Sequence, residues 1–452
     1  MRVKRITQRS FQDAFPKSRR GREMAAMSLL LDEVPEILDL VHHDLTAGTS
    51  AGAGRQGMTA EQVFRCAVLK HLHGFTYEDL ELFLQDSWSI RAFARLRPDQ
   101  EPTDTTLQAN IARIQPETWE AINGLLVTLA QDKAIEKGRK VRIDTTVVDT
   151  DIHHPTDASL LFDGIRVLTR LLEEGQALRP TPRYSVSNHL RVAKKRLLAI
   201  RNSRSNQARV QPYRDMVEIA LKVAGYTRGA LGALHAWTGE DEAQRAHGLW
   251  IAQEMRRVLD LLLRVIDQTR RRVFDGEAVP AKEKVVSLFE EHTDIITKSR
   301  RETQFGHKVC LVTGASSMVL DCVIERGNPA DSELFARMLD RQEALYGRYP
   351  RQSTADGGFA SKGNLAAGKD KGVKDVCFAK KRGLTIAAMA KSPWVYRLLR
   401  NFRAGIEANI SVLKRAFGLD CCTWSGWRGF LSYVWSAIIA YNLAVMARVL
   451  IA

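Results

Sequence analysis

The chain has 452 residues, of which 45% are hydrophobic and 26% charged. It is long enough for two or three domains and too apolar to be a disordered chain. Lys and Arg exceed Asp and Glu by 15 charges, which favours a polyanionic partner such as DNA, although RNA or an acidic membrane would fit the same excess. Six cysteines without a CxxC spacing indicate reduced thiols in a cytosolic protein.

The first 135 residues are predicted to form a compact helical domain. Thr59 and Gln62 form a capping box before VFRCAVLKHLHG, whose apolar residues are spaced by three and four. Gly74 ends this helix, and Pro116 opens a later one. Short helices joined by tight turns are typical of a helix-turn-helix module that binds DNA, and a helical bundle without DNA contact is the alternative.

Residues 136–157 contain the first predicted strand, a β-branched run with the sequence KVRIDTTVVDT. This strand carries Asp144. Asp149, Asp151 and Asp157 follow closely and compete with it as metal ligands. In a regular strand, alternation places Asp149 on the face opposite Asp144.

Residues 158–300 are predicted to form a long helical insertion. Within it, residues 183–214 contain nine Lys or Arg and no Asp or Glu. We expect Lys194, Lys195 and Arg196, on the helical part of this segment, to follow a DNA phosphate backbone. The alternative is a basic helix face that contacts only solvent.

From residue 301 the pattern changes to strands alternating with helices. HKVCLVTG and SMVLDCVIERG are β-branched runs joined by a short turn, which predicts an antiparallel hairpin. An amphipathic helix ending at Gly347 follows, and then a short strand that delivers Asp356. The apolar stretch from Gly429 is long enough to cross a membrane but lacks flanking anchors, so a buried helix covering the sheet is favoured.

The stretch Arg400–Lys414 is predicted to be helical. Its spacing places Arg403, Glu407 and Lys414 within a sector of about 40°, so two cations flank one carboxylate along a single stripe. Taken alone, this stripe is most simply a salt-bridged solvent face.

Asp144 and Asp356 make Glu407 a candidate metal ligand instead of an ordinary surface carboxylate. Asp144 and Asp356 on neighbouring strands, with Glu407 on a helix packed against them, would form a cluster of three carboxylates. Such a cluster is costly unless a divalent cation neutralises it, and oxygen-only ligands favour Mg²⁺ or Mn²⁺. A pair of these ions suits in-line attack on a phosphodiester.

These motifs together resemble the DDE transposases of bacterial insertion sequences. The resemblance extends over nearly the whole chain, and the group it resembles most is called ISNCY. It lies in IDTT around Asp144, FGHKV at Phe305–Val309, ADGGF around Asp356, and R-x3-E-x6-K at Arg403, Glu407 and Lys414. The last motif resembles the family's YREK signature, except that Arg400 stands in the place of the tyrosine.

The resemblance implies an α/β fold class with an RNase H-like catalytic core, built from residues 136–157 and 301–452. It further implies that residues 1–135 are an all-α DNA-binding domain and that residues 158–300 are inserted into the core. In this interpretation the N-terminal domain binds the inverted repeats of an insertion sequence.

The catalytic implications concern the carboxylates and the nearby cations. Asp144, Asp356 and Glu407 would hold two Mg²⁺ ions, with Mn²⁺ as a substitute, for cleavage at the element ends and joining to target DNA. Arg403 and Lys414 would hold the terminal phosphates, with Arg400 as a further phosphate contact.

The expected partner is double-stranded DNA, bound by a homodimer that assembles on it. The protein is expected in the cytoplasm, associated with the nucleoid and not with a membrane. Two alternatives are a structure-specific nuclease with an RNase H-like fold and a DNA-binding repressor derived from a transposase. Three intact carboxylates argue against the repressor, and a strand-transfer assay with a 3′-hydroxyl end separates the nuclease from a transposase.

Overall fold

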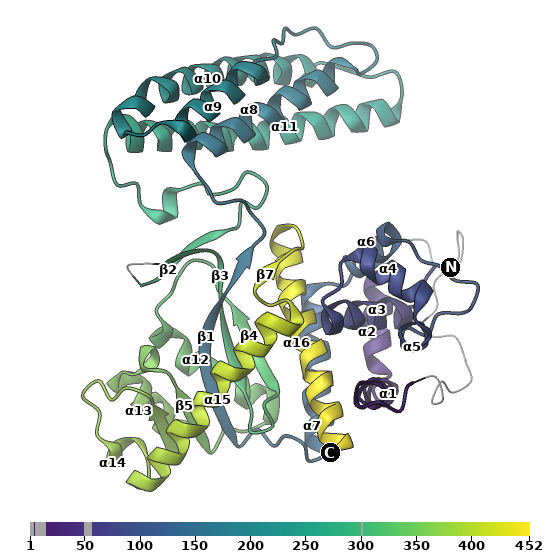
Figure 1. The fold of residues 1–452 in the computed structure, drawn as a ribbon, viewed down its shortest axis with the longest axis vertical. Coiled ribbons are helices and arrows are strands. Elements are labelled where there is room, and N and C mark those ends of the chain that lie inside the picture. Colours follow the sequence, from purple (N-terminus) through teal and green to yellow (C-terminus); the bar gives the residue numbers. More distant parts are fainter. Residues whose placement is uncertain (1–3, 5–14, 49–56, 300–301) are drawn as a thin grey trace. The chain divides into compact units, whose positions relative to one another are not determined.

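The computed structural model describes residues 4, 15–48, 57–299 and 302–452 (Figure 1). The chain forms two compact units. The first unit combines Met1–Asp151 with Ile296–Ala452, and the second is Ile152–Ile295. The second unit therefore interrupts the first, between its first strand and the rest of its sheet.

The N-terminal part of the first unit is helical. Its helices are α1 (Arg19–Asp32), α2 (Glu36–Thr46), α3 (Ala60–His73), α4 (Tyr77–Asp86), α5 (Trp88–Phe93), α6 (Asp104–Ile111) and α7 (Pro116–Asp132). The predicted capping box of Thr59 and Gln62 is confirmed, and α3 ends at Gly74 in the left-handed region with φ +68°. Nearly all of α3 is buried, because α2, α6 and a C-terminal helix pack around it.

A mixed sheet of seven strands forms the other half of this unit. Its strands are β1 (Lys140–Thr150), β2 (Asp294–Ser299), β3 (Glu302–Thr313), β4 (Val319–Ile324), β5 (Gln352–Ala355), β6 (Asp375–Phe378) and β7 (Cys421–Cys422). The order is β2-β3-β1-β5-β6, with β4 also beside β3 and β7 also beside β1. The predicted antiparallel hairpin is confirmed as β3 and β4.

The central strand β1 has different partners along its two halves. On one side it pairs antiparallel with β3. On the other side β5 runs parallel to it from Lys140 to Ile143, and β7 pairs with it at Asp149 and Thr150. Asp144 therefore lies just beyond the point where β5 ends.

Helices α12 (Asp331–Tyr346), α13 (Lys362–Asp370), α14 (Ile386–Met389) and α15 (Pro393–Phe417) follow the hairpin in the sequence. Ser392 caps α15, Pro393 occupies its first turn, and Gly418 ends it with φ +78°. One side of α15 packs on β1, β5 and β6, which brings the predicted R-x3-E-x6-K helix onto the sheet.

The C-terminal helix α16 (Gly426–Ile451) lies between the N-terminal helices and the sheet, as Figure 1 shows. It is the one helix in the described chain that is long and apolar enough to cross a membrane, and 78% of its most apolar window is buried within the protein. Its Asn442 side chain bonds to Asn123 of α7 and to the backbone of Val319 in β4. The helix therefore has the environment of a core helix.

A single hydrophobic core runs from α1 through α16 to the sheet. The N-terminal helices and the sheet are consequently one packing unit, and residue 135 marks no gap in the core. The division of this unit into a DNA-binding domain and a catalytic domain stays a prediction about function.

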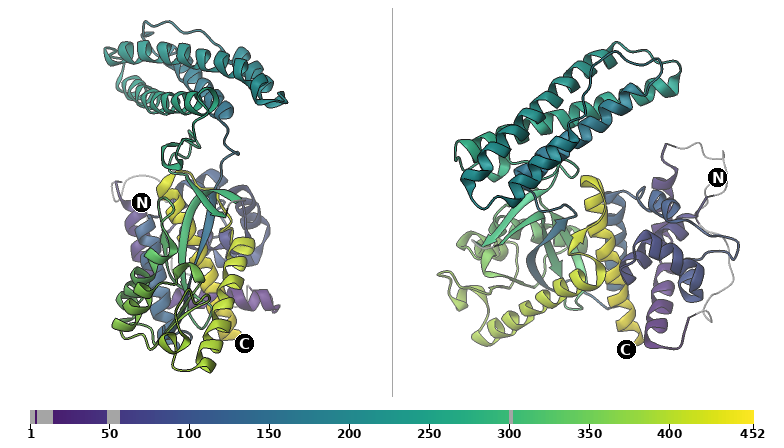
Figure 2. Two further views of the ribbon diagram at one scale, coloured as in Figure 1. Left: turned by 90° about the vertical axis from the view of Figure 1, so that its left-hand side faces the viewer. Right: turned by 45° about the horizontal axis from the view of Figure 1, so that its top comes forward.

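The second unit is a bundle of α8 (Asp157–Gln176), α9 (Leu190–Asn202), α10 (Asn206–His235) and α11 (Glu242–Thr269), which run alongside one another in Figures 1 and 2. It has its own core. The basic helix α9 buries Ala193, Leu197 and Ile200 against the bundle. Its outer face exposes Lys194 and Lys195 to solvent.

Candidate active site

The two aspartates occupy equivalent positions on adjacent parallel strands. Ile143 of β1 pairs with Ala355 of β5, so Asp144 and Asp356 are the next residues along the two strands. The predicted adjacency of these strands is therefore confirmed. Glu407 comes from α15, which packs on both strands. Residues more than 200 positions apart in the chain thus meet at one edge of the sheet.

Arg403 joins the three carboxylates. Its Nη2 lies 2.7 Å from Oε1 of Glu407, and 3.5 Å from both Oδ2 of Asp144 and Oδ1 of Asp356. The Glu407 contact is the predicted pairing along the helix, whereas the other two contacts cross to the sheet. Arg403 is nearly buried at 15% exposure, so these attractions are screened less than those of a surface ion pair.

The three carboxylates differ in their exposure to solvent. The Asp144 side chain is 14% exposed, that of Asp356 42% and that of Glu407 62%. Burial raises the pKa of Asp144 to about 6, and the charge of Asp356 adds to this rise. The Thr145 amide and the Arg403 guanidinium act in the opposite direction. The deepest carboxylate is thus the one whose negative charge most needs a cation.

Arg142 fixes α15 against the sheet. Its guanidinium, in a residue only 5% exposed, donates to the Phe402 carbonyl on α15 and to Thr313, Gly314 and Ser317 beside β3, each over 3.1 Å. It also stacks over the Phe402 ring at 4.4 Å. Gly405 makes this approach possible, because a Cβ there would overlap Nη1 of Arg142.

A cavity of about 550 Å³ opens beside the carboxylates. It is also lined by Lys308 and Asp331, which the sequence did not suggest as site residues. Lys308 is 7% exposed, and its ammonium lies 3.1 Å from Asp331 and 2.6 Å from the Pro329 carbonyl. The Thr145 hydroxyl donates to the same Asp331 carboxylate over 3.2 Å. In the sequence, the only feature that points to Asp331 is its place as the first residue of a helix that follows a predicted strand.

The other predicted site residues lie in different surroundings. Lys414 is directed at Asp420, 3.1 Å away. Arg400 is exposed on α15. In the helical unit, Lys194 and Lys195 are exposed, whereas Arg196 forms an ion pair with Asp215.

The competing aspartates have other environments. Near Asp149 are the charges of Lys414 and Asp420, and burial raises its pKa. Asp157 belongs to the helical unit, where it pairs with Arg272 and accepts a hydrogen bond from Gln268.

The carboxylates have the donor chemistry for a hard divalent cation. Their oxygens are the ligands that Mg²⁺ and Mn²⁺ prefer. In the described chain no three His, Cys, Asp or Glu side chains already surround a common point for an ion, because the carboxylates are arranged around Arg403 instead. The buried Nε of Arg403 has no hydrogen-bond partner among the described residues. The three carboxylates therefore fit a divalent cation if the Arg403 guanidinium, whose Nε no described residue holds by a hydrogen bond, moves away from them.

Two family models match the chain. Residues 263–443 match the Transposase DDE domain, and residues 10–113 match the Transposase domain (DUF772). No curated protein and no solved structure matches. The chain belongs to the DDE transposases of insertion sequences. Membership of this family implies an RNase H-like core, which the mixed α/β sheet of the first unit accommodates.

The matched range covers part of the transposase's carboxylate cluster. Asp356 and Glu407 lie inside it, whereas Asp144 precedes it, because the helical unit separates β1 from the remaining strands. The grouping of Asp144 with the other two therefore rests on strand pairing. DDE transposases use divalent metals, typically Mg²⁺.

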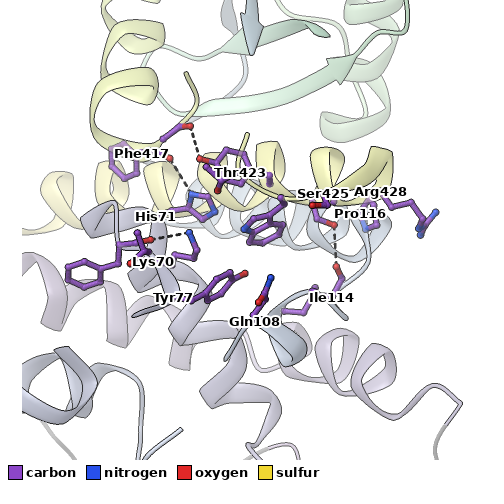
Figure 3. Close-up of a pocket in the computed structure, with 18 of the residues that line it drawn as sticks. Lys70, His71, Tyr77, Gln108, Ile114, Pro116, Phe417, Thr423, Ser425 and Arg428 are labelled. Atoms are coloured by element: carbon purple, nitrogen blue, oxygen red, sulfur yellow. Dashed lines mark hydrogen bonds between the residues drawn. The ribbon is translucent and has the colours of Figure 1, made fainter. Parts of the chain in front are cut away.

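A second cavity of the transposase, about 560 Å³, lies between α3, α6 and the start of α16 (Figure 3). Its polar wall groups bond to one another. Buried His71 contacts the Phe417 carbonyl through Nδ1 and the Ser436 hydroxyl through Nε2, and Tyr433 donates to the Gly418 carbonyl. Because these bonds tie α3 and α16 to the end of α15, the cavity walls connect the N-terminal helices to the helix that carries Glu407.

The close approach of Gly405 to Arg142 predicts the effect of adding one methyl group. Gly405→Ala should displace α15 from β1 and lower the rate of DNA cleavage at least tenfold, even though alanine favours a helix by about 1 kcal/mol. It should also lower the thermal midpoint of unfolding. The matched control is Gly225→Ala in α10, where a Cβ meets no described atom within 4 Å. This control should raise the midpoint slightly, and equal effects of the two changes would contradict the packing argument.

Proposed function

We propose that this transposase binds the inverted repeats of an insertion sequence, cleaves at the element ends and joins them to target DNA, with Asp144, Asp356 and Glu407 as its catalytic carboxylates. The observation that carries this proposal is their convergence on one nitrogen of Arg403 at the edge of the sheet. Three acidic side chains from two strands and a helix have no evident structural need to meet at that point.

Mg²⁺ or Mn²⁺ held by these carboxylates would supply a nucleophile activated at neutral pH and charge stabilisation for the leaving oxygen. Arg403 has a separate role. A guanidinium presents a planar fork of donors that matches phosphate oxygens. We assign it to the phosphate of the element end, and in the free protein it neutralises the carboxylates until DNA arrives.

The distribution of charge supports DNA contacts by the insertion and the catalytic part. Residues 1–135 hold 16 Lys or Arg against 18 Asp or Glu, whereas residues 296–452 hold 24 against 12 and residues 152–295 hold 23 against 18. Recognition of the inverted repeats by the N-terminal helices would therefore depend on base contacts and shape, and most phosphate contacts would come from the other two regions.

The remaining assignments follow from the family resemblance. We propose that the chain is of the ISNCY-like group, works as a homodimer assembled on DNA, and is located at the nucleoid. The exposed cations Lys194 and Lys195 are assigned to the DNA backbone. Arg196, already paired with Asp215, is assigned a smaller share of that contact.

The first test concerns the carboxylates. Asp144→Asn, Asp356→Asn and Glu407→Gln should each lower Mg²⁺-dependent cleavage of a DNA end about a thousandfold or more, because removing a ligand costs several kcal/mol of transition-state stabilisation. Binding of the uncleaved end should change little. Asp149→Asn serves as the control and should cleave normally. Near-normal cleavage by Asp356→Asn would remove that residue from the site.

The second test separates phosphate binding from metal binding. Arg403→Ala should retain or raise Mn²⁺ affinity, because the competing guanidinium is gone, and it should weaken binding of a pre-cleaved DNA end. Arg403→Lys should restore this binding only in part, since an ammonium cannot form the bidentate contact. Lys414→Ala should have a smaller effect, because its ammonium already pairs with Asp420. Calorimetric titration with Mn²⁺ and end-binding assays measure both properties. Lower Mn²⁺ affinity with normal end binding would exclude the phosphate role.

The third test uses the salt dependence of DNA binding. Replacing both Lys194 and Lys195 with Ala should weaken binding to all duplex sequences alike and lower the slope of log K against log salt by about 0.9 for each phosphate that is no longer neutralised. The control replaces two exposed cations outside the basic segment, Lys222 and Arg228, and should leave the slope unchanged. The same slope in both double variants would show that α9 contacts only solvent.

A further inference from the structure

A patch of exposed cations lies beside the carboxylate edge of the sheet. It consists of six residues from the loop after β6, the turn before α15 and the first half of α15, and all six are exposed. None of them takes part in an ion pair among the described residues. We call this surface the basic track, and its members are Lys380, Lys381, Arg382, Lys391, Arg397 and Arg400.

The basic track begins at the catalytic edge. Strands β5 and β6 are parallel, and Ala355 pairs with Phe378, so the residues after both strands emerge at the same edge. Lys380 lies against the residue that follows Asp356, since a Cβ on Gly357 would be 2.8 Å from the Lys380 Cβ. The first cation of the track therefore packs against the residue next to a proposed metal ligand.

The track continues onto α15. Tyr396 donates from its hydroxyl to the carbonyl of Phe378, the last residue of β6, over 3.1 Å. This bond fixes the first half of α15 beside the strand end from which Lys380 and Lys381 emerge. Arg397 and Arg400 follow Tyr396 on the outer side of the helix. Figure 1 shows α14 at the start of α15, so the chain passes through α14 between the loop after β6 and Lys391.

An aromatic side chain lies among these cations. Trp394 is 64% exposed, one helical turn before Arg397, and Leu398 beside it is 44% exposed. Most large aromatic side chains of this unit are packed into the core. Lys391 and Arg397 are three residues before and after it. An exposed indole flanked by cations suits single-stranded nucleic acid, because a base can stack on the ring while the phosphates contact the cations.

We propose that the basic track binds an unpaired DNA strand leading away from the carboxylates, with one base stacked on Trp394. This inference rests on the proposed function, because it takes the DNA strand at the site as given. Stacking on Trp394 requires a base whose face is free, which selects an unpaired strand over an intact duplex. A second copy of the chain is a poor occupant, because a symmetric contact would bring six unpaired cations against six others.

The experiment measures binding of a fluorescently labelled 12-nucleotide oligo-dT to the full chain by anisotropy, without divalent cations. Trp394→Ala should weaken binding about tenfold, within the usual contribution of one stacked base, and Trp394→Phe should retain most of the affinity. The matched control is Trp88→Ala. Trp88 is equally exposed at 63% but follows the acidic helix α4, so its loss should change nothing.

The cations are tested by salt dependence. Replacing Lys381 and Arg397 together with Ala should lower the single-strand salt slope by about 0.7 for each phosphate that is no longer neutralised. Unchanged affinity of Trp394→Ala, or equal losses for oligo-dT and for a blunt duplex, would overturn the proposal of an unpaired strand. Weaker association between copies of the chain, with normal oligo-dT binding, would assign the patch to protein contact instead. Since the assay involves no cleavage, its failure would leave the carboxylate assignment standing, and cleavage-deficient carboxylate variants should still bind oligo-dT.

Discussion

The mutual repulsion of Asp144, Asp356 and Glu407 is the constraint around which this edge of the sheet is arranged. The three carboxylates all contact the same guanidinium, so they lie close to one another. Three negative charges this close in a partly buried site destabilise the fold unless a cation lies among them. In the free protein that cation is the Arg403 guanidinium, held 2.7–3.5 Å from all three. The same residue would therefore have to move, or share the carboxylates, to admit a divalent cation.

The position of Arg403 depends in turn on how closely α15 approaches β1. Arg142 bonds the helix to the sheet through the Phe402 carbonyl, and Gly405 leaves room for its side chain. A second set of contacts holds the far end of the helix, where His71 of α3 meets the Phe417 carbonyl. The helix is consequently fixed at its middle by the sheet and at its end by the N-terminal helices, which together set the position of Glu407 between them.

Local patterns in the sequence were sufficient for much of the fold. The capping box at Thr59 and the hairpin of β3 and β4 depend on neighbouring residues, and the structure confirms both. The adjacency of Asp144 and Asp356 came from family resemblance, because strand order across an insertion has no local signal. Lys308 and Asp331 were not predicted as site residues, because each has the local pattern of an ordinary strand or helix residue. Only tertiary packing places both in the cavity.

The distribution of charge and the helical architecture point to different parts of the protein as the proposed DNA-binding region. Short helices made the N-terminal region the expected DNA-binding part, yet residues 1–135 have a small excess of acidic residues and helix α4 carries four carboxylates without a cation. The positive charge is concentrated beside the carboxylates and in the helical insertion. If the protein binds DNA as proposed, long-range attraction would act mainly on these two regions, and the N-terminal helices would select among sequences already held there. Under the proposed function, affinity for DNA and sequence specificity would therefore reside in different elements and would respond differently to salt.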